Sequence, residues 1–361
     1  MTFKLTELLY QNIVLEDHKE VRLRVYADQV GCPPIMVDSG TSHIEVICFK
    51  KTFLKIFTEC HSKLTELLDH NSNLELDVYL GTIGLLFTTF ENRTILNLHE
   101  SLFLDMVNSI DGDKSLRKEI RLVEALLSSN LSKLNKSSSL WLWYKKLVVL
   151  QREKNFNSEI QVVKTCLASA ELHPSNYYSW NMLRWYCDIV REENNRDHIF
   201  HNIRKFAFSH LKDISAWEML SHFYLGNWDY NASEYRRLAV RFNIHHCDKL
   251  GIQGEGEDIT CKISTLITTL ADYIDLCEVS EWPPYLTLYK LISITKPQSF
   301  EYLKKWEAQV QPYPNSEGRN NHVNDILRLS KDKHMDVKKK FLKKVANIYE
   351  VEMGYTSTAN D

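Results

Sequence analysis

The chain has 361 residues, of which 44% are hydrophobic and 25% are charged, and its formal net charge is −3. This balance is typical of a folded globular protein and excludes a disordered chain. A charge so close to zero predicts no nucleic-acid partner. Glycine and proline together make up about 5% of the residues, well below their usual share, so we expect mostly helices joined by short connections.

The cysteines and the apolar segments indicate the cellular compartment in which the protein is found. Eight cysteines are scattered along the chain without a CxxC motif. This spacing favours reduced thiols in a cytoplasmic protein over a disulfide framework or a zinc site. The N-terminus lacks the apolar core of a signal peptide, and no window holds 18 uninterrupted apolar residues. We therefore predict a cytoplasmic protein without a transmembrane segment.

The first part of the chain carries few signals. Residues 1–75 contain no repeat, and we expect a partly helical region that packs on the rest of the chain. Within it, the segment Gly31-Cys32-Pro33-Pro34 predicts a turn or an extended stretch. Further along, Asp111-Gly112-Asp113 lacks the remaining ligands of an EF-hand loop and predicts a turn.

A regular tryptophan interval is the most informative feature. Trp143, Trp180 and Trp217 are separated by two equal intervals of 37 residues. Each tryptophan follows polar turn-forming residues and lies on an apolar stripe with helical spacing. Each of these helices is preceded by another apolar stripe, at residues 120–131, 160–170 and 199–206. The repeating unit is therefore a helical hairpin. Because one hairpin cannot bury its apolar face alone, we predict an all-α fold in which hairpins stack into a right-handed solenoid.

Weaker copies of the hairpin flank the clear ones. Leu96 and Leu288 occupy positions where the interval would place a tryptophan. We therefore assign the repeats to residues 76–300, with a loop near 250–258, and a helical capping region to 301–361. Residues 335–345 form a basic amphipathic helix, for which contact with a membrane surface is an alternative to capping.

The second tryptophan lies in a recognisable motif. Protein prenyltransferase α-subunits carry the repeat motif Asn-Tyr-x-x-Trp-x-His-Arg-x-Trp, and the chain matches it at Asn176, Tyr177, Trp180 and Trp185. The chain thus resembles this family over roughly residues 80–295. It is most similar to the divergent branch known as the prenyltransferase α-subunit repeat-containing protein, the α-subunit of type III geranylgeranyltransferase.

The resemblance implies a function. The chain would be a non-catalytic or co-catalytic α-subunit of a heterodimeric protein geranylgeranyltransferase. It would wrap a Rab-type β-subunit that holds zinc and geranylgeranyl diphosphate, and help to bind a protein substrate with C-terminal cysteines, such as an already farnesylated SNARE. No cofactor is expected in this chain, which would be inactive alone.

The motif is incomplete, and this leaves alternatives. Its His-Arg pair is replaced by Met182-Leu183, and Ser138 stands where farnesyltransferase-type α-subunits carry a lysine. These departures favour the alternative of a helical-repeat scaffold that has lost the prenyltransferase partnership. A stand-alone enzyme is a third reading, but the sequence offers no catalytic constellation for it.

No catalytic or metal-binding residue is predicted. His245, His246 and Cys247 are adjacent and cannot all face one metal ion. The tryptophans Trp143, Trp180 and Trp217 are expected in the repeat core. Candidates for contact with a partner or substrate cleft, with ordinary packing or a solvated helix face as the alternative, are Asn176, Tyr177, Tyr178, Lys136, Lys145 and Lys146.

Overall fold

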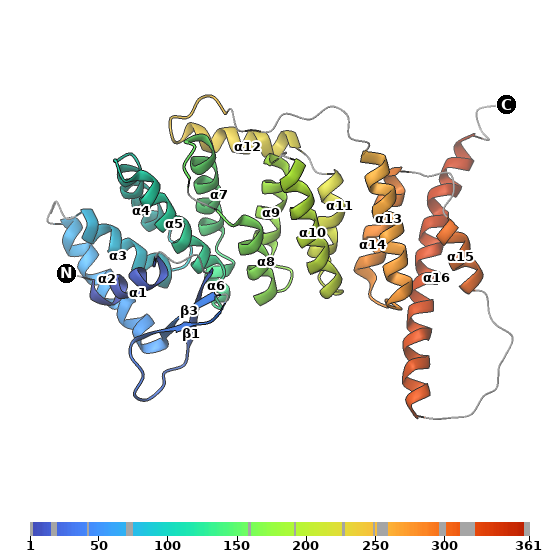
Figure 1. Cartoon of the computed structure of the whole chain (residues 1–361), viewed down its shortest axis with the longest axis horizontal. Coiled ribbons are helices and arrows are strands. Elements are labelled where there is room, and N and C mark those ends of the chain that lie inside the picture. Colours follow the sequence, from blue (N-terminus) through green and yellow to red (C-terminus); the bar gives the residue numbers. More distant parts are fainter. Residues whose placement is uncertain are drawn as a thin grey trace. The chain divides into compact units, whose positions relative to one another are not determined.

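The chain is mostly helical, with sixteen helices and one small sheet in the part that the structure describes (Figure 1). A computed structural model describes residues 3–15, 20–41, 43–69, 75–157, 160–190, 193–225, 228–247, 250, 259–295, 301–310 and 322–356. The predicted loop at residues 251–258 lies outside these ranges. Residues 1–199 and 227–252 form one compact unit, and residues 200–226 and 253–361 form a second. The predicted boundaries at residues 75 and 300 stay predictions.

A three-stranded sheet near the N-terminus corrects the all-α expectation. Its strands are β1 (Glu20–Tyr26), β2 (Ile35–Ser39) and β3 (His43–Phe49), in the order β1-β3-β2. Strand β1 is parallel to β3, and β2 is antiparallel to it. Strand β1 alternates buried Val21 and Leu23 with polar residues, and β3 is rich in β-branched residues, both of which are strand signals. The tryptophan repeat does not extend into residues 1–75, so its helical periodicity carries no information about this sheet.

Helices surround the sheet in the first unit. Helices α1 (Lys4–Ile13) and α5 (Gly112–Leu127) pack against it, and β3 continues directly into α2 (Lys50–Asp69). Helices α3 (Glu75–Thr88) and α4 (Arg93–Val107) follow, and the short α6 (Ser132–Asn135) precedes the repeats. Helix α3 lies so close to its neighbours at Gly84 that a Cβ atom there would overlap Cys60 Sγ and lie 2.7 Å from Thr6 Oγ1.

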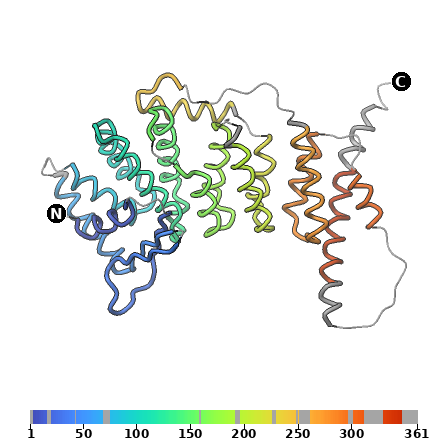
Figure 2. The backbone as a smooth tube through the Cα atoms, viewed as in Figure 1, coloured from blue at the N-terminus to red at the C-terminus, as the bar shows by residue number. Residues whose placement is uncertain are grey.

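The predicted helices around the tryptophans are confirmed (Figure 2). Trp143 lies in α7 (Ser138–Glu153), Trp180 in α9 (Tyr177–Ile189) and Trp217 in α11 (Ile214–Leu225). The predicted turn residues cap these helices, because Ser137, Asn176 and Asp213 accept hydrogen bonds from backbone N–H groups of the first turn. The preceding stripes lie on helices α5, α8 (Val162–Leu172) and α10 (Glu193–Ser209). Helices α8 and α9 form a hairpin across the turn at residues 173–176.

The repeat positions are buried. Trp143, Trp180 and Trp217 are at most 1% exposed, and the weaker positions Leu96 and Leu288 are also buried. One element interrupts the simple succession of helices. Helix α12 (Trp228–Val240) follows α11 in sequence but belongs to the first unit, where it packs against α7 and α9.

An aromatic cluster forms the core of the second unit. Helices α13 (Ile259–Leu276), α14 (Trp282–Thr295), α15 (Glu301–Val310) and α16 (His322–Thr356) make up most of this unit. The rings of Tyr285, Trp306 and Phe341 have centroids 5.6–6.0 Å apart. Phe341 and Val345 are buried, so the apolar face of α16 packs within the unit instead of being presented to a membrane. No described helix combines the length and hydropathy needed to cross a bilayer.

Candidate functional site

Three of the predicted contact residues, Tyr177, Tyr178 and Lys136, are at least partly exposed in the first unit. Tyr177 begins α9 and is 64% exposed, and Tyr178 is half-buried. Their ring centroids are 5.5 Å apart, with the rings nearly perpendicular. Exposed Lys136 lies at the C-terminal end of α6, and His173 lies at the end of α8. Partial burial and the nearby Lys136 charge lower the pKa of His173. We call Lys136, His173, Tyr177 and Tyr178 the tyrosine patch.

Asn176 holds this patch in place but is not itself accessible. It is 1% exposed, and its side-chain oxygen accepts a hydrogen bond from the Tyr178 backbone N–H at 3.2 Å. Its amide group donates to the Asn135 backbone oxygen at 3.2 Å and to Ser169 Oγ at 3.0 Å. Asn176 therefore caps α9 and joins the α8–α9 turn to α6, which brings Lys136 beside His173.

Lys145 and Lys146 do not reach an open cleft. Lys145 is 7% exposed, donates to Glu234 Oε2 at 2.7 Å, and lies over the Trp185 ring at 5.1 Å. Burial lowers its pKa, and the Glu234 carboxylate opposes that effect. Lys146 is 3% exposed and is paired with Glu100. Both lysines therefore link α7 to neighbouring helices, α12 and α4, through buried ion pairs.

A buried polar cluster around Glu119 was not predicted. Glu119 is fully buried and accepts hydrogen bonds from Tyr79 Oη at 2.6 Å, Trp143 Nε1 at 2.7 Å and His99 Nε2 at 3.0 Å. The sequence did contain a signal, because Glu119 falls on the same helical stripe as the buried Leu116 and Val123. A carboxylate on an apolar stripe requires buried partners.

Both ring nitrogens of His99 take part in the cluster. Thr82 donates its hydroxyl hydrogen to the Tyr79 backbone oxygen at 2.6 Å. Thr82 Oγ1 also lies 2.8 Å from His99 Nδ1, and His99 Nε2 lies 3.0 Å from Glu119 Oε1. Burial alone would raise the pKa of Glu119, but the His99 charge and the hydrogen bonds hold it below its ordinary value. The cluster has no exposed atom for a substrate and stabilises the fold.

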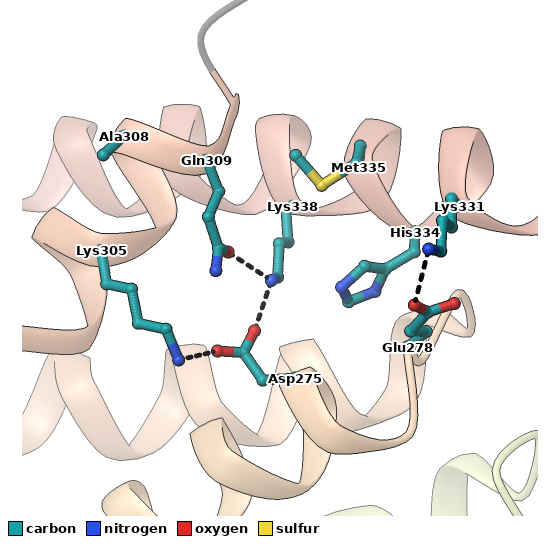
Figure 3. Close-up of a pocket in the computed structure, with 9 residues that line it drawn as sticks. All are labelled: Asp275, Glu278, Lys305, Ala308, Gln309, Lys331, His334, Met335 and Lys338. Atoms are coloured by element: carbon teal, nitrogen blue, oxygen red, sulfur yellow. Dashed lines mark hydrogen bonds and ion pairs between the residues drawn. The ribbon is translucent and has the colours of Figure 1, made fainter. Parts of the chain in front are cut away.

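A pocket of about 750 Å³ lies in the second unit (Figure 3). Lys305 Nζ donates to Asp275 Oδ2 at 2.8 Å, and Lys338 Nζ is bonded to the other oxygen of Asp275. Lys338 also donates to Gln309 Oε1 at 2.9 Å, and Lys331 Nζ lies 3.8 Å from Glu278 Oε1. The nine residues that line the pocket come from α13 and the turn after it, α15 and α16: Asp275, Glu278, Lys305, Ala308, Gln309, Lys331, His334, Met335 and Lys338.

Metal chemistry has no candidate centre among the residues that the structure describes. Within them, no three His, Cys, Asp or Glu side chains are grouped so that they could hold a metal ion. The adjacent His245, His246 and Cys247 belong to the described part, and they form no such group.

The fold and the sites together define a mostly helical protein whose conspicuous polar residues cap helices or form buried pairs. Residues 1–128 match the ECM9 N-terminal domain, and residues 140–246 match the ECM9 middle domain. Protein ECM9 of Saccharomyces cerevisiae is 30% identical over 352 residues, an alignment that covers 91% of this chain and 92% of that protein. The chain belongs to the ECM9 family.

This membership corrects the prenyltransferase resemblance, which was wrong. The comparisons point to the ECM9 family and not to prenyltransferase α-subunits. The physical reason lies in the matched residues. Asn176 caps a helix, and Trp180 and Trp185 are core residues that are 1% exposed. Three of the four matched motif residues therefore serve the packing of a helical hairpin. They carry no information about transferase activity. The Rab-type β-subunit, the heterodimer and the substrate with C-terminal cysteines were expected only because of this resemblance, and they are not supported. The zinc ion and the geranylgeranyl diphosphate were assigned to that β-subunit, so nothing now supports them either.

Proposed function

We propose that this ECM9-family chain is a non-catalytic helical scaffold that binds a protein partner at the tyrosine patch. In this proposal the helical hairpins within each unit stack in the manner of a right-handed solenoid, as the repeat interval predicts. The repeat interval and the burial of Trp143, Trp180 and Trp217 support that arrangement. Eight cysteines without a disulfide support a place in the reducing cytoplasm.

One observation carries the proposal: Tyr177 is 64% exposed although the helix cap beneath it is buried and fully bonded. A large aromatic side chain held at a fixed position in solvent can bury its ring in a partner with little loss of conformational entropy. The neighbouring Tyr178 and Lys136 extend this surface with a second ring and a positive charge. Tyrosine is among the residues that are enriched at protein interfaces.

The buried polar groups support a scaffold over an enzyme. Glu119, Lys145 and Lys146 are buried ionisable side chains, a kind of group that active sites use. Each is paired inside the protein and is at most 7% exposed. They stabilise the hairpins, and a reacting group has no access to them.

A photo-crosslinking experiment tests the proposal. Tyr177 is replaced by p-benzoylphenylalanine in the full chain, expressed in cells, and adducts are identified after irradiation. Tyr230 in α12, which is 70% exposed, provides the matched control position. We expect one defined protein adduct at position 177 and none of the same mass at position 230.

The partner identified from the adduct is then purified, and its affinity for the chain is measured. For the purified partner, Tyr177→Ala is expected to weaken binding about 30-fold, the effect of a hot-spot residue worth about 2 kcal/mol, and Tyr230→Ala is expected to leave it unchanged. Equal adducts at both positions, or no adduct at position 177, would contradict the docking role of the patch.

A further inference from the structure

The pocket between α13, α15 and α16 is lined by more positive than negative side chains. Lysines 305, 331 and 338 face two carboxylates, those of Asp275 and Glu278. Lys305 and Lys338 converge on Asp275, and the ring of His334 lies between Lys338 and Lys331 (Figure 3). The lining residues therefore carry one more positive than negative charge, although Asp272, which does not line the pocket, also acts on Lys305.

The inner part of the pocket is already bonded. Lys338 has a side chain that is 3% exposed, and it donates to Asp275 and Gln309 while it lies over the Trp306 ring at 4.8 Å. His334 Nδ1 lies 2.7 Å from the Val279 backbone oxygen, to which it donates its proton. Lys338 and His334 thus form a rigid floor, in which Lys338 is a fixed positive charge.

Among the described residues, the rim has N–H donors for which no protein acceptor is found within hydrogen-bonding distance. Lys305 donates one of its three N–H groups to Asp275. Lys331 lies 3.8 Å from Glu278, which is beyond hydrogen-bonding distance, so its donors are available to a ligand. Gln309 accepts from Lys338 with its oxygen, which leaves its amide N–H groups for the pocket. The side chains of Lys305 and Lys331 are 58% and 64% exposed, so both can move to meet a ligand.

Size and chemistry together limit the ligand. Several N–H donors around a surplus positive charge suit an acceptor-rich dianion, and phosphate is the common biological group of that kind. A volume of about 750 Å³ is typical of pockets for small organic molecules and is much larger than a lone phosphate needs. Ala308 and Met335 add apolar wall for the remainder of such a molecule.

We propose that this pocket binds a small organic phosphate, with Lys305, Lys331 and Gln309 donating to the phosphate oxygens above the fixed charge of Lys338. The site is separate from the tyrosine patch and does not depend on the scaffold function.

The test measures binding of two probes, inorganic pyrophosphate and fructose 1,6-bisphosphate, to the full chain by isothermal titration calorimetry at constant ionic strength. Lys331→Ala removes a rim donor from a mostly exposed side chain, so the fold is preserved. Lys333→Ala is the matched control, because Lys333 is an exposed lysine on the same helix that does not line the pocket. Loss of one charged hydrogen bond corresponds to roughly a tenfold or greater loss of affinity.

We expect fructose 1,6-bisphosphate to bind, Lys331→Ala to weaken it at least about tenfold, and Lys333→Ala to leave it within about twofold. The double variant Lys305→Ala/Lys331→Ala is expected to abolish binding while the melting temperature without ligand stays unchanged. Equal losses for Lys331→Ala and Lys333→Ala would show unspecific attraction to a basic helix and overturn the site. Binding of a phosphoserine peptide in the absence of any binding of the two probes would also overturn it, because the ligand would then be a modified protein.

Discussion

The buried carboxylate of Glu119 allows the sharpest test of how the first unit is held together. Glu119→Gln keeps the shape of the side chain but removes its charge. One carboxylate oxygen accepts from His99 and Trp143, and the other accepts from Tyr79. If the amide NH₂ group faces Trp143, the hydrogen bond from Trp143 Nε1 is lost, and if it faces Tyr79, the Tyr79 hydroxyl must accept where it donated before.

The size of the effect follows from the surroundings. His99 and Glu119 are both 0% exposed, so water cannot replace the missing charge. Removing one partner of a buried ion pair costs about 3–5 kcal/mol, because the other charge is left without compensation. We therefore expect Glu119→Gln to lower the free energy of unfolding of the first unit by about 3–5 kcal/mol.

Native-state hydrogen exchange of the α5 backbone amides is the suitable assay, since α5 carries Glu119 and the two units need not unfold together. Glu66→Gln, at an exposed position in α2, is the control and should change stability by less than about 0.5 kcal/mol. A loss below about 1 kcal/mol for Glu119→Gln would refute the contribution assigned to the His99–Glu119 pair.

The same variant has a pH signature. The pKa of Glu119 lies below its ordinary value of 4.5 in the folded protein, so the unfolded chain takes up the proton first as the pH falls. The stabilisation is therefore complete above about pH 5 and is lost as the pH falls below 4.5 toward the folded pKa. We expect the difference between the wild type and Glu119→Gln to shrink over this range. A constant difference would contradict the assignment.

Three further changes probe local structure, each measured by chemical denaturation of the full chain. Gly84→Ala should lower the free energy of unfolding by about 1–3 kcal/mol, because the added Cβ atom would overlap Cys60 Sγ. At a helix position with free space, the same substitution would stabilise the protein. An increase in stability would therefore contradict the close packing of α3. Asn130→Ala should lower the free energy of unfolding by about 1–2 kcal/mol, because two hydrogen bonds to the Val25 backbone are lost. The Asn130 side-chain oxygen accepts from Val25 N–H at 2.8 Å, and its NH₂ group donates to the Val25 oxygen at 3.1 Å. Unchanged hydrogen exchange of the Val25 backbone N–H would argue against these bonds. Glu91→Gln should cost about 0.5–1 kcal/mol, because the Glu91 carboxylate bonds two serine hydroxyls at the N-terminus of α7; no change would show that the charge is unimportant there.

The helical hairpins were predictable because their signals are local. A tryptophan interval of 37 residues, an apolar stripe and a polar cap all lie within a few turns of one another. Ser137, Asn176 and Asp213 cap their helices through residues two or three positions away. Such short-range patterns survive in the sequence even where the partner helix is unknown.

The sites were only partly predictable. Tyr177 and Lys136 are exposed as a contact role requires, whereas Lys145 and Lys146 are buried in pairs with Glu234 and Glu100. A helical stripe tells which residues share a face, but it does not tell whether a second helix covers that face. The family resemblance failed for a related reason, since motif residues that serve packing recur wherever such hairpins occur.

The amino-acid sequence by itself determined the helices, their caps and the buried repeat positions, because these depend on neighbours along the chain. Only the tertiary structure decided which distant segments meet. The parallel pairing of β1 with β3, the ion pair of His99 with Glu119 and the convergence of Lys305 and Lys338 on Asp275 each join residues at least 20 positions apart. Their energies come from burial and charge in the assembled protein, and no local pattern specifies which partner a buried charge will find.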